Sequence, residues 1–301
     1  MNGLLVIDKP GGITSHDVVN RLRRITGEKS IGHLGTLDPM ATGVLPLLLG
    51  KYTRLAQYFS TAEKSYSGTI RFGFATDTYD AEGQPAGPDL WPDLRTLTGS
   101  AVTLETVRTA AARFLGESNQ VPPPFSAKKI AGKPAYKLAR EGKPVELKPA
   151  KVLISSFEIA ALDNAEATFT MSISAGGYVR SVAHEIGQAL HCGAHLSSLR
   201  RTQAGVFTLA EAHTLEQLEA AAAATPEALE SLCVHPRNLL PEFPSVTGDP
   251  QALGRLRNGA QANLPEFSQA AMVKVFAGQR DLVGIAKRVA GTLFQPLVVM
   301  G

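Results

Sequence analysis

The stretch GHLGTLDPMATGVLPLLLG, residues 32–50, contains the feature that decides how this chain folds and works. It sets one carboxylate, Asp38, directly before a proline, and an apolar run from Val44 to Leu49 follows. Because the ring of Pro39 disfavours helical geometry at the preceding residue, Asp38 is expected on an extended loop. Gly32, Gly35 and Gly43 permit backbone conformations closed to other residues, or let a ligand approach the main chain closely. The pattern predicts one reactive acid on a rigid loop beside a strand.

A lone Asp-Pro pair usually does no more than form a turn. Here, however, further motifs accompany the pair in a fixed order along nearly the whole chain. They are KPGGITSHD at 9–17, KSY at 64–66, TDTYD at 76–80, QVPP at 120–123, SAK at 126–128, GYVR at 177–180, AHL at 194–196 and LRRT at 199–202. With the Asp38 stretch, this set resembles the TruB-type tRNA pseudouridine synthases of the bacterial stand-alone type. The resemblance implies an enzyme that converts uridine 55 of the tRNA T-loop to pseudouridine.

Pseudouridine formation breaks the bond between uracil N1 and ribose C1′, turns the base over and rejoins it through C5. The reaction needs a nucleophile or base at the sugar-base junction, a closed pocket that retains the uracil, and a means of extracting the base. The resemblance implies that Asp38 is the reacting group. The sequence leaves three routes open, namely attack on ribose C1′, attack on uracil C6, or removal of a ribose proton.

Two further residues complete the catalytic set that the resemblance implies. Arg180 pairs with Asp38, and a cation close to a carboxylate favours its ionised form and lowers its pKa. Tyr66 packs against the target base, since an aromatic ring can stack on an extruded base. Taken alone, a single arginine is most often a surface residue, and Tyr66 lies in an alternating segment typical of a core strand. The motifs favour the catalytic interpretation of both.

The resemblance also implies RNA contacts around the pocket. His33 contacts the T-loop where bases are pulled out, and Leu199 occupies an apolar position of the pocket. Lys9 and Tyr178 are assigned to the RNA-contacting set with them. A lone histidine is more often a satisfied structural residue, so His33 rests on its motif.

Basic charge is concentrated in one segment although the whole chain carries only +3. Residues 128–151 contain eight basic side chains and two acids, next to three consecutive prolines at 122–124. Such a segment is typical of phosphate contacts, the alternative being a solvated charged face. The resemblance implies a thumb-like insertion over about 120–151 that closes on the T-stem and T-loop. Its predicted RNA contacts are Lys128, Lys129, Lys133 and Arg140, and a separate basic cluster adds Arg200 and Arg201.

The composition fits a globular enzyme of more than one domain. The chain has 301 residues, of which 44% are hydrophobic and 19% charged, enough to bury a sizeable core. No apolar run approaches the roughly 20 residues that a membrane helix needs, and Met1 to Asp8 does not resemble a signal peptide. A cytoplasmic location is expected. Cys192 and Cys233 lie far apart in the sequence, which argues against a disulfide framework.

The pattern of segments predicts an α+β fold with a mixed, mainly antiparallel sheet and flanking helices. By resemblance this is the pseudouridine synthase fold. A helix capped by Thr14 or Ser15 is expected to run to about Ile25, with Gly27 ending it, and further helices are expected over 104–115, 179–190 and 215–232. Strands are expected over 4–7 and 69–74, and a hairpin pairs 152–161 with 165–174.

Two domains are predicted, a catalytic domain over 1–235 and a small β-rich domain over 245–301. Four prolines between 236 and 250 indicate a linker. Short strands are expected over 272–276, 282–286 and 296–300. The resemblance implies that this second domain is a PUA-like RNA-binding module.

No metal or cofactor is expected. The segment from Gly43 to Lys51 has the wrong glycine spacing for a phosphate loop. His184 begins like a zinc-protease helix, but Gln188 occupies the second histidine position, and the spacing of His191 and His195 is ascribed to chance. The acids of the 76–80 motif are interpreted as turn formers.

Two other functions remain open. One is a guide-RNA-dependent pseudouridine synthase, against which the long basic insertion argues. The other is an RNA-binding or folding protein without turnover, against which the joint presence of Asp38, Tyr66 and Arg180 argues. The expected partner is tRNA, with no membrane, no obligatory protein partner and a monomeric chain.

Overall fold

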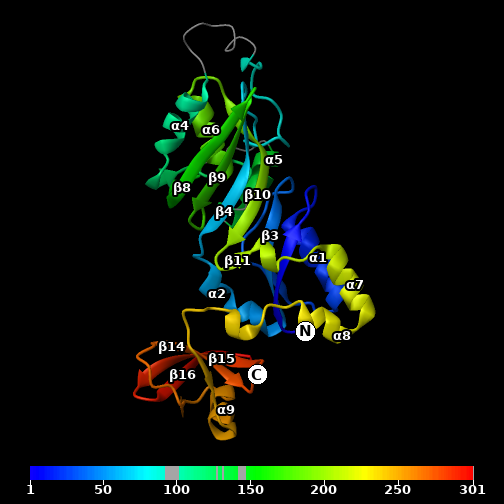
Figure 1. Cartoon of the computed structure of the whole chain (residues 1–301), viewed down its shortest axis with the longest axis vertical. Coiled ribbons are helices and arrows are strands. Elements are labelled where there is room, and N and C mark those ends of the chain that lie inside the picture. The colour runs from blue at the N-terminus through cyan, green and yellow to red at the C-terminus, as the bar shows by residue number, and fades with distance from the viewer. Residues whose placement is uncertain (92–101, 127, 131, 142–146, 301) are drawn as a thin grey trace.

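The computed structural model describes residues 1–91, 102–126, 128–130, 132–141 and 147–300, so part of the predicted thumb, 142–146, lies outside the described residues. Its main sheet is built from β1 (Gly3–Lys9), β2 (Ile31–His33), β3 (Thr42–Leu49), β4 (Lys64–Phe72), β5 (Gly116–Gln120), β8 (Ala150–Asp163), β9 (Glu166–Ile173), β10 (Ala194–Ala204) and β11 (Phe207–Thr208). The order is β1-β3-β10-β4-β9-β8-β5, with β2 beside β3 and β11 beside β10 (Figure 1). Every pair is antiparallel except β3 with β10. The predicted mixed, mainly antiparallel sheet is confirmed.

Helices pack against this sheet and around its edge. They are α1 (Ser15–Thr26), α2 (Ala56–Phe59), α4 (Leu104–Ala112), α5 (Ala135–Arg140), α6 (Val179–Ala189), α7 (Leu215–Ala224) and α8 (Pro226–Ser231), with short 3-10 turns at Gly50–Leu55, Leu209–Glu211 and Pro236–Asn238. In Figure 1, α4 and α6 lie together beside β8 and β9, and α1 lies beside α7. The main core forms between these helices and the sheet, with Val107, Val182 and Phe169 among its buried members.

The ends of α1 follow from its sequence. The side chain of Thr14 accepts a hydrogen bond from the backbone N–H of Asp17, and the Asp17 carboxylate accepts one from the N–H of Thr14. This reciprocal cap satisfies two donors that the first helical turn leaves free. Gly27 ends the helix in the left-handed conformation, with φ 69°. The predicted start and stop are confirmed.

Two predictions about the region after residue 215 are wrong in detail. The single helix over 215–232 is two helices, because Thr225 is extended and Pro226 begins α8 as its first residue. The proline-rich segment is not a plain linker, because it contains β12 (Ser245–Thr247) and the start of α9 (Pro250–Arg257). Pro250 opens α9 for the same reason that Pro226 opens α8.

A second sheet occupies the C-terminal part of the chain. Its order is β12-β14-β15-β16-β13, where β13 is Ala262–Asn263, β14 Met272–Ala277, β15 Asp281–Ala290 and β16 Leu293–Val299. The three predicted strands of this region are present as β14, β15 and β16. The remaining small sheet, β6 (Lys129–Ile130) with β7 (Lys133–Pro134), lies in the basic insertion.

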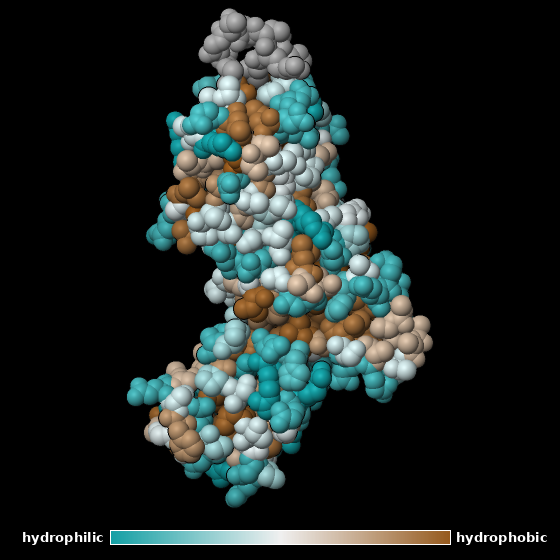
Figure 2. Space-filling view, in the orientation of Figure 1, coloured by the Kyte–Doolittle hydropathy of each residue, from teal (hydrophilic) through white to brown (hydrophobic). Residues whose placement is uncertain are grey.

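The two large sheets share a hydrophobic cluster. Val6 and Leu48 of the first sheet and Tyr52 pack in one cluster with Phe276 and Ile285 of the second. Figure 2 shows hydrophobic surface at the level where the two parts meet. The C-terminal sheet is therefore fixed against the β1 and β3 side of the larger sheet by apolar burial. Within the described residues, no helix combines the length and the apolar character that crossing a membrane demands.

Candidate active site

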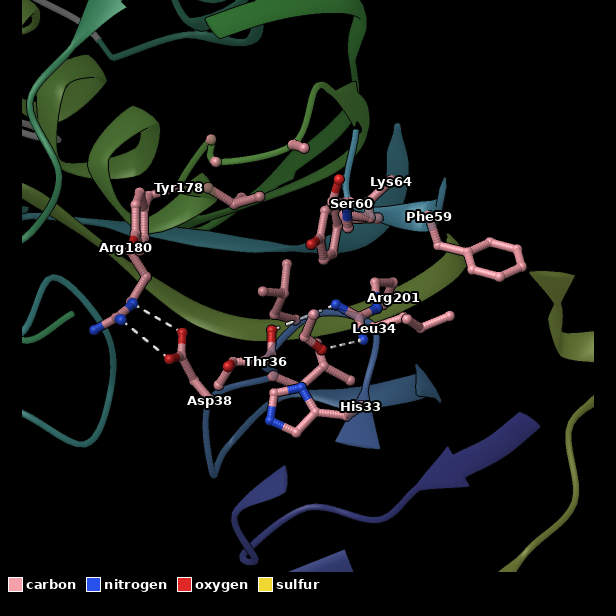
Figure 3. A pocket seen from close by; sticks show the side chains of 18 of the residues that line it. His33, Leu34, Thr36, Asp38, Phe59, Ser60, Lys64, Tyr178, Arg180 and Arg201 are labelled. Atoms are coloured by element: carbon pink, nitrogen blue, oxygen red, sulfur yellow. Dashed lines mark hydrogen bonds and ion pairs between the residues drawn. The ribbon is translucent and has the colours of Figure 1, made fainter. Parts of the chain in front are cut away.

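A pocket of about 470 Å³ opens where β4, β10, the start of α6 and the loop between β2 and β3 meet. Its wall combines apolar and charged side chains, and its volume lies within the usual range for ligand sites. The lining includes His33, Leu34, Thr36, Asp38, Phe59, Ser60, Lys64, Tyr66, Tyr178, Arg180, Leu199 and Arg201. Figure 3 shows Asp38 and Arg180 facing one another at one end and Phe59, Ser60 and Lys64 at the other.

Asp38 and Arg180 form a close ion pair although 141 residues separate them in the sequence. Arg180 Nη2 donates a hydrogen bond to Asp38 Oδ1 at 3.0 Å, and Nε lies 2.9 Å from Oδ2 without the alignment of a hydrogen bond. The Arg180 side chain is 6% exposed, whereas Asp38 keeps 30% of its side chain open to the pocket. The carboxylate is thus held from one side and accessible from the other.

Arg180 is held in turn by the segment after β4. Its Nη1 lies 3.1 Å from Asp80 Oδ2 and 3.0 Å from the carbonyl oxygen of Thr78, and Nη2 donates to the carbonyl of Phe125 at 3.0 Å. The Asp80 side chain is 4% exposed. A buried cation needs such partners, because an unpaired one is strongly destabilising.

Asp80 is the functional residue that sequence reasoning missed. It does form the predicted turn, since its Oδ1 accepts hydrogen bonds from the hydroxyl of Thr78 and the N–H of Glu82. Its second oxygen, however, binds Arg180. The signal was present in the motif at 76–80, but only the fold brings that motif to α6.

The pKa of Asp38 differs from the prediction. Pairing with Arg180 was expected to lower it, yet burial in the pocket wall raises the pKa of this carboxyl above its ordinary value. The Arg180 guanidinium opposes the rise and the Asp80 carboxylate adds to it. The net direction is upward because desolvation penalises the charged form more than the nearby cations Arg180 and Lys9 favour it.

Three buried side chains pin the loop that carries Asp38. The hydroxyl of Ser15 accepts from the N–H of Leu37 at 2.8 Å and donates to its carbonyl at 3.0 Å. Lys9 Nζ donates to the carbonyl of Pro39 at 3.1 Å. Arg201 donates to Gly35 O at 3.0 Å and to Val44 O at 2.7 Å, in the same loop and the strand after it. The predicted rigid loop is therefore present, and its rigidity comes from all three side chains.

The prediction that Lys9 and Arg201 contact RNA does not fit this arrangement. Both side chains are fully buried, and their donors are directed at backbone carbonyls. Burial also lowers the pKa of Lys9 to about 8, an effect that Glu82 and Asp38 oppose. These two cations hold the Asp38 loop through backbone carbonyls and do not face solvent. Gly43 lets Arg201 come this close, since a Cβ at Gly43 would lie 2.2 Å from the Arg201 carbonyl oxygen.

The start of α6 is fixed by the segment after β5. The side-chain amide of Gln120 donates to Tyr178 O at 3.0 Å and its oxygen accepts from Tyr178 N at 2.7 Å. Ser181 Oγ donates to Val121 O at 2.9 Å. This arrangement sets the position of Arg180, which lies between these two contacts. The motif at 120–123 thus fixes the start of α6, a role that its composition does not reveal.

The remaining predicted pocket residues line one cavity. Tyr66 and Leu199 are buried in its wall, on the adjacent strands β4 and β10. His33 lies at the rim, where burial and the nearby Arg201 lower its pKa, so the ring is neutral at pH 7. Its Nδ1 is buried and has no hydrogen-bond partner among the described residues. Burial raises the pKa of Tyr178, which keeps the phenol protonated.

The predicted basic contacts are more scattered. Lys133 is exposed, and Lys128 is partly exposed, with its ammonium 3.4 Å from the carbonyl of Lys148. The side chains of Lys129 and Arg140 lie outside what the structure describes. Arg200 projects from β10 and pairs with Asp8 at 2.7 Å.

Comparison with solved structures identifies the fold. A chain of the structure described as "Crystal Structure of a Cbf5-Nop10-Gar1 Complex" matches with a TM-score of 0.68 and 25% sequence identity, over 96% of this chain and 79% of that one. The likeness extends over both sheets. The fold is therefore that of the pseudouridine synthases related to Cbf5.

Sequence comparison identifies the family. The model described as TruB family pseudouridylate synthase (N terminal domain) matches residues 23–179, and tRNA pseudouridylate synthase B C-terminal domain matches 180–240. The chain is 46% identical over 303 residues to "tRNA pseudouridine synthase B" of Solibacter usitatus (strain Ellin6076), covering 100% of both chains. It is 38% identical over 308 residues to the protein of that name from Burkholderia mallei (strain NCTC 10247), covering 100% of this chain and 98% of the relative. The chain belongs to the TruB family of pseudouridylate synthases.

The contacts of Arg180 predict the effect of neutralising Asp80. In Asp80→Asn the buried cation loses one of its two carboxylates, so the guanidinium shifts relative to Asp38. We expect kcat for RNA turnover to fall about 10- to 100-fold with little change in KM, because a small misplacement is costly at the reacting centre. The matched control is Asp77→Asn, since Asp77 is exposed and serves only to accept from the N–H of Gln84. Equal kcat values for the two variants would contradict this role.

Proposed function

We propose that this chain is a tRNA pseudouridine synthase that isomerises uridine 55 of the T-loop by an aspartate-dependent cleavage and re-formation of the glycosidic bond. The observation that carries the proposal is the single carboxylate, Asp38, presented to the pocket and paired with a buried arginine. The names of the full-length relatives support pseudouridine formation in tRNA. The position within the tRNA is inferred from the motifs.

In this proposal Asp38 acts at the sugar-base junction as a nucleophile or base. Arg180 keeps its carboxylate in place and favours its ionised form against the cost of burial. Tyr66 and Leu199 form the wall against which the extruded uracil packs, so the freed base stays beside C1′ while it turns. The three chemical routes use one carboxylate at nearly the same place and remain alternatives.

His33 and Tyr178 would contact the RNA around the target base. The neutral imidazole of His33 has a buried Nδ1 that no described residue bonds, and an extruded neighbouring base could form a hydrogen bond with it. Tyr178 borders the pocket next to Arg180, and its protonated phenol can donate a hydrogen bond. Neither side chain carries charge at neutral pH, so selectivity at the rim would come from shape and hydrogen bonding.

A stand-alone, monomeric and cytoplasmic enzyme is part of this proposal. The name of the Cbf5 structure places that protein in a complex with Nop10 and Gar1, which keeps a partner-dependent enzyme as the second candidate. Identity favours the stand-alone form, since relatives named tRNA pseudouridine synthase B reach 46% over the full chain. We further propose a catalytic domain over 1–235 and a PUA-like RNA-binding domain over 245–301.

The direct test is turnover by the purified protein without guide RNA or added protein. A T-arm transcript tritiated at uracil C5 should release tritium to the solvent, because C5 loses its hydrogen when its bond to ribose C1′ forms. Mapping of the product should place pseudouridine only at position 55. Asp38→Asn should release none while still binding the transcript, since the amide is a far weaker nucleophile and base. A requirement for guide RNA or partner proteins would support the second candidate. Turnover by Asp38→Asn at the wild-type rate would show that another residue reacts.

The thumb assignment predicts a specific salt effect. Replacing Lys128 and Lys133 together with alanine should raise KM and leave kcat unchanged, because phosphate contacts position the RNA without entering the chemistry. The slope of log KM against log salt concentration should fall by about one for each lost contact. Lys29→Ala, at an exposed lysine after α1, is the control for general loss of charge. An unchanged salt slope in the double variant would exclude these lysines from the RNA interface.

A further inference from the structure

The segment that holds Arg180 contains a strained residue. Tyr79 has φ 66°, in the left-handed region that non-glycine residues rarely adopt. Its neighbours Thr78 and Asp80 are the two residues of this segment that bind Arg180. Strain of this kind persists only where the surroundings enforce it.

The φ angle of Tyr79 controls one of these contacts. Rotation about its N–Cα bond turns the preceding peptide group, which carries the carbonyl oxygen of Thr78. At φ 66° that oxygen lies 3.0 Å from Arg180 Nη1. The N–H of the same peptide group makes only a long bond, 3.3 Å, to the carbonyl of Thr76. Relaxation of Tyr79 to an ordinary negative φ would therefore turn the Thr78 carbonyl away from the guanidinium.

A face-to-face stack fixes the side chain of Tyr79. Its ring lies on the imidazole of His184, with centroids 3.8 Å apart and planes at 10°. His184 follows Arg180 by four residues on α6, so the two side chains lie on the same side of this helix. The helix thus contacts the 78–80 segment twice, through hydrogen bonds at Arg180 and through the stack one turn later.

Little else supports the ring of His184. A hollow of about 630 Å³ borders the stack, lined by Tyr79, His184, Glu185 and Gln188 among others. His184 Nε2 lies 3.0 Å from Gln188 Nε2, and the buried Nδ1 has no hydrogen-bond partner within the part of the chain that the structure describes. Burial lowers the pKa of His184, so the ring is neutral when it stacks. The face contact with Tyr79 is therefore the main interaction of this imidazole.

We propose that the stack of Tyr79 on His184 is a positioning device for Arg180, holding Tyr79 in the left-handed conformation that aims the Thr78 carbonyl and places the Asp80 carboxylate. His184 and Tyr79 are positioning residues and do not contact the substrate. The inference rests on the proposed function, in which Arg180 fixes Asp38 for reaction. It assigns a role to Tyr79 and His184, which the predicted catalytic set of Asp38, Tyr66 and Arg180 does not include.

The test compares variants of the stack in steady-state turnover on the T-arm transcript, below the melting temperature of every variant. His184→Ala should lower kcat about tenfold with KM unchanged, since the pocket is intact but Arg180 is misplaced. His184→Phe should restore kcat, because a flat ring can stack again. Adding Tyr79→Gly to His184→Ala should recover part of kcat, since glycine adopts positive φ without cost. Gln188→Ala does not alter the stacked rings, so this variant should have the wild-type kcat.

Recovery of kcat on removing the Tyr79 ring as well as the His184 ring distinguishes positioning from general stability. If stability alone were at issue, the second deletion would lower the activity further. A wild-type kcat in His184→Ala, or a loss that neither His184→Phe nor Tyr79→Gly reverses, would overturn the proposal. A second readout is independent of turnover. The Nε–H resonance of Arg180 in a nitrogen-15 spectrum, assigned by its loss in Arg180→Lys, should move in His184→Ala and return in His184→Phe. An unmoved resonance would overturn the stack's role, whereas an inactive wild type with this pattern would count only against the proposed function.

Discussion

The buried guanidinium of Arg180 is the interaction on which the rest of the site depends. A cation removed from water must be met by carboxylates and carbonyls, or the folded state bears the full cost of desolvation. Here those partners come from three segments, at Asp38, at 78–80 and at Phe125. Satisfying one charge therefore draws together the catalytic loop, the segment after β4 and the segment after β5.

The sheet makes this convergence possible. β4 and β10 pair side by side, so Tyr66 and Leu199 line the same pocket although they are far apart in the sequence. Two fully buried cations, Lys9 and Arg201, hold the Asp38 loop through backbone carbonyls. Arg180 thus faces the carboxylate of Asp38, whereas Lys9 and Arg201 hold the loop that carries it.

Local sequence signals predicted the local structure well. The cap at Thr14, the stop at Gly27 and the apolar run of β3 are present because each depends on neighbouring residues alone. The break at Pro226 was visible in the sequence and was overlooked. The motifs also predicted that Asp38, Tyr66 and Arg180 would meet.

The features that the sequence did not predict depend on burial and on contacts between distant segments. The motif that contains Lys9 favoured an RNA contact for this lysine. In the fold the side chain is buried, and its ammonium donates to backbone carbonyls. Asp80 read as a turn former because its partner Arg180 is 100 residues away. The pKa of Asp38 moves opposite to the expectation because burial, which charge pairing cannot reveal, is the largest contribution.

The most direct test of the Asp38–Arg180 pair is the pKa of Asp38 itself, measured by carbon-13 NMR of the carboxyl group. Its resonance is assigned by its loss in Asp38→Asn. We expect a pKa above the ordinary 3.8 in the wild type. The pKa should rise further in Arg180→Met, because this change removes the only cation paired with the carboxylate among the described residues while the carboxyl group stays buried. An unchanged or lower pKa in folded Arg180→Met would contradict the claim that this arginine holds the catalytic carboxylate in its ionised form.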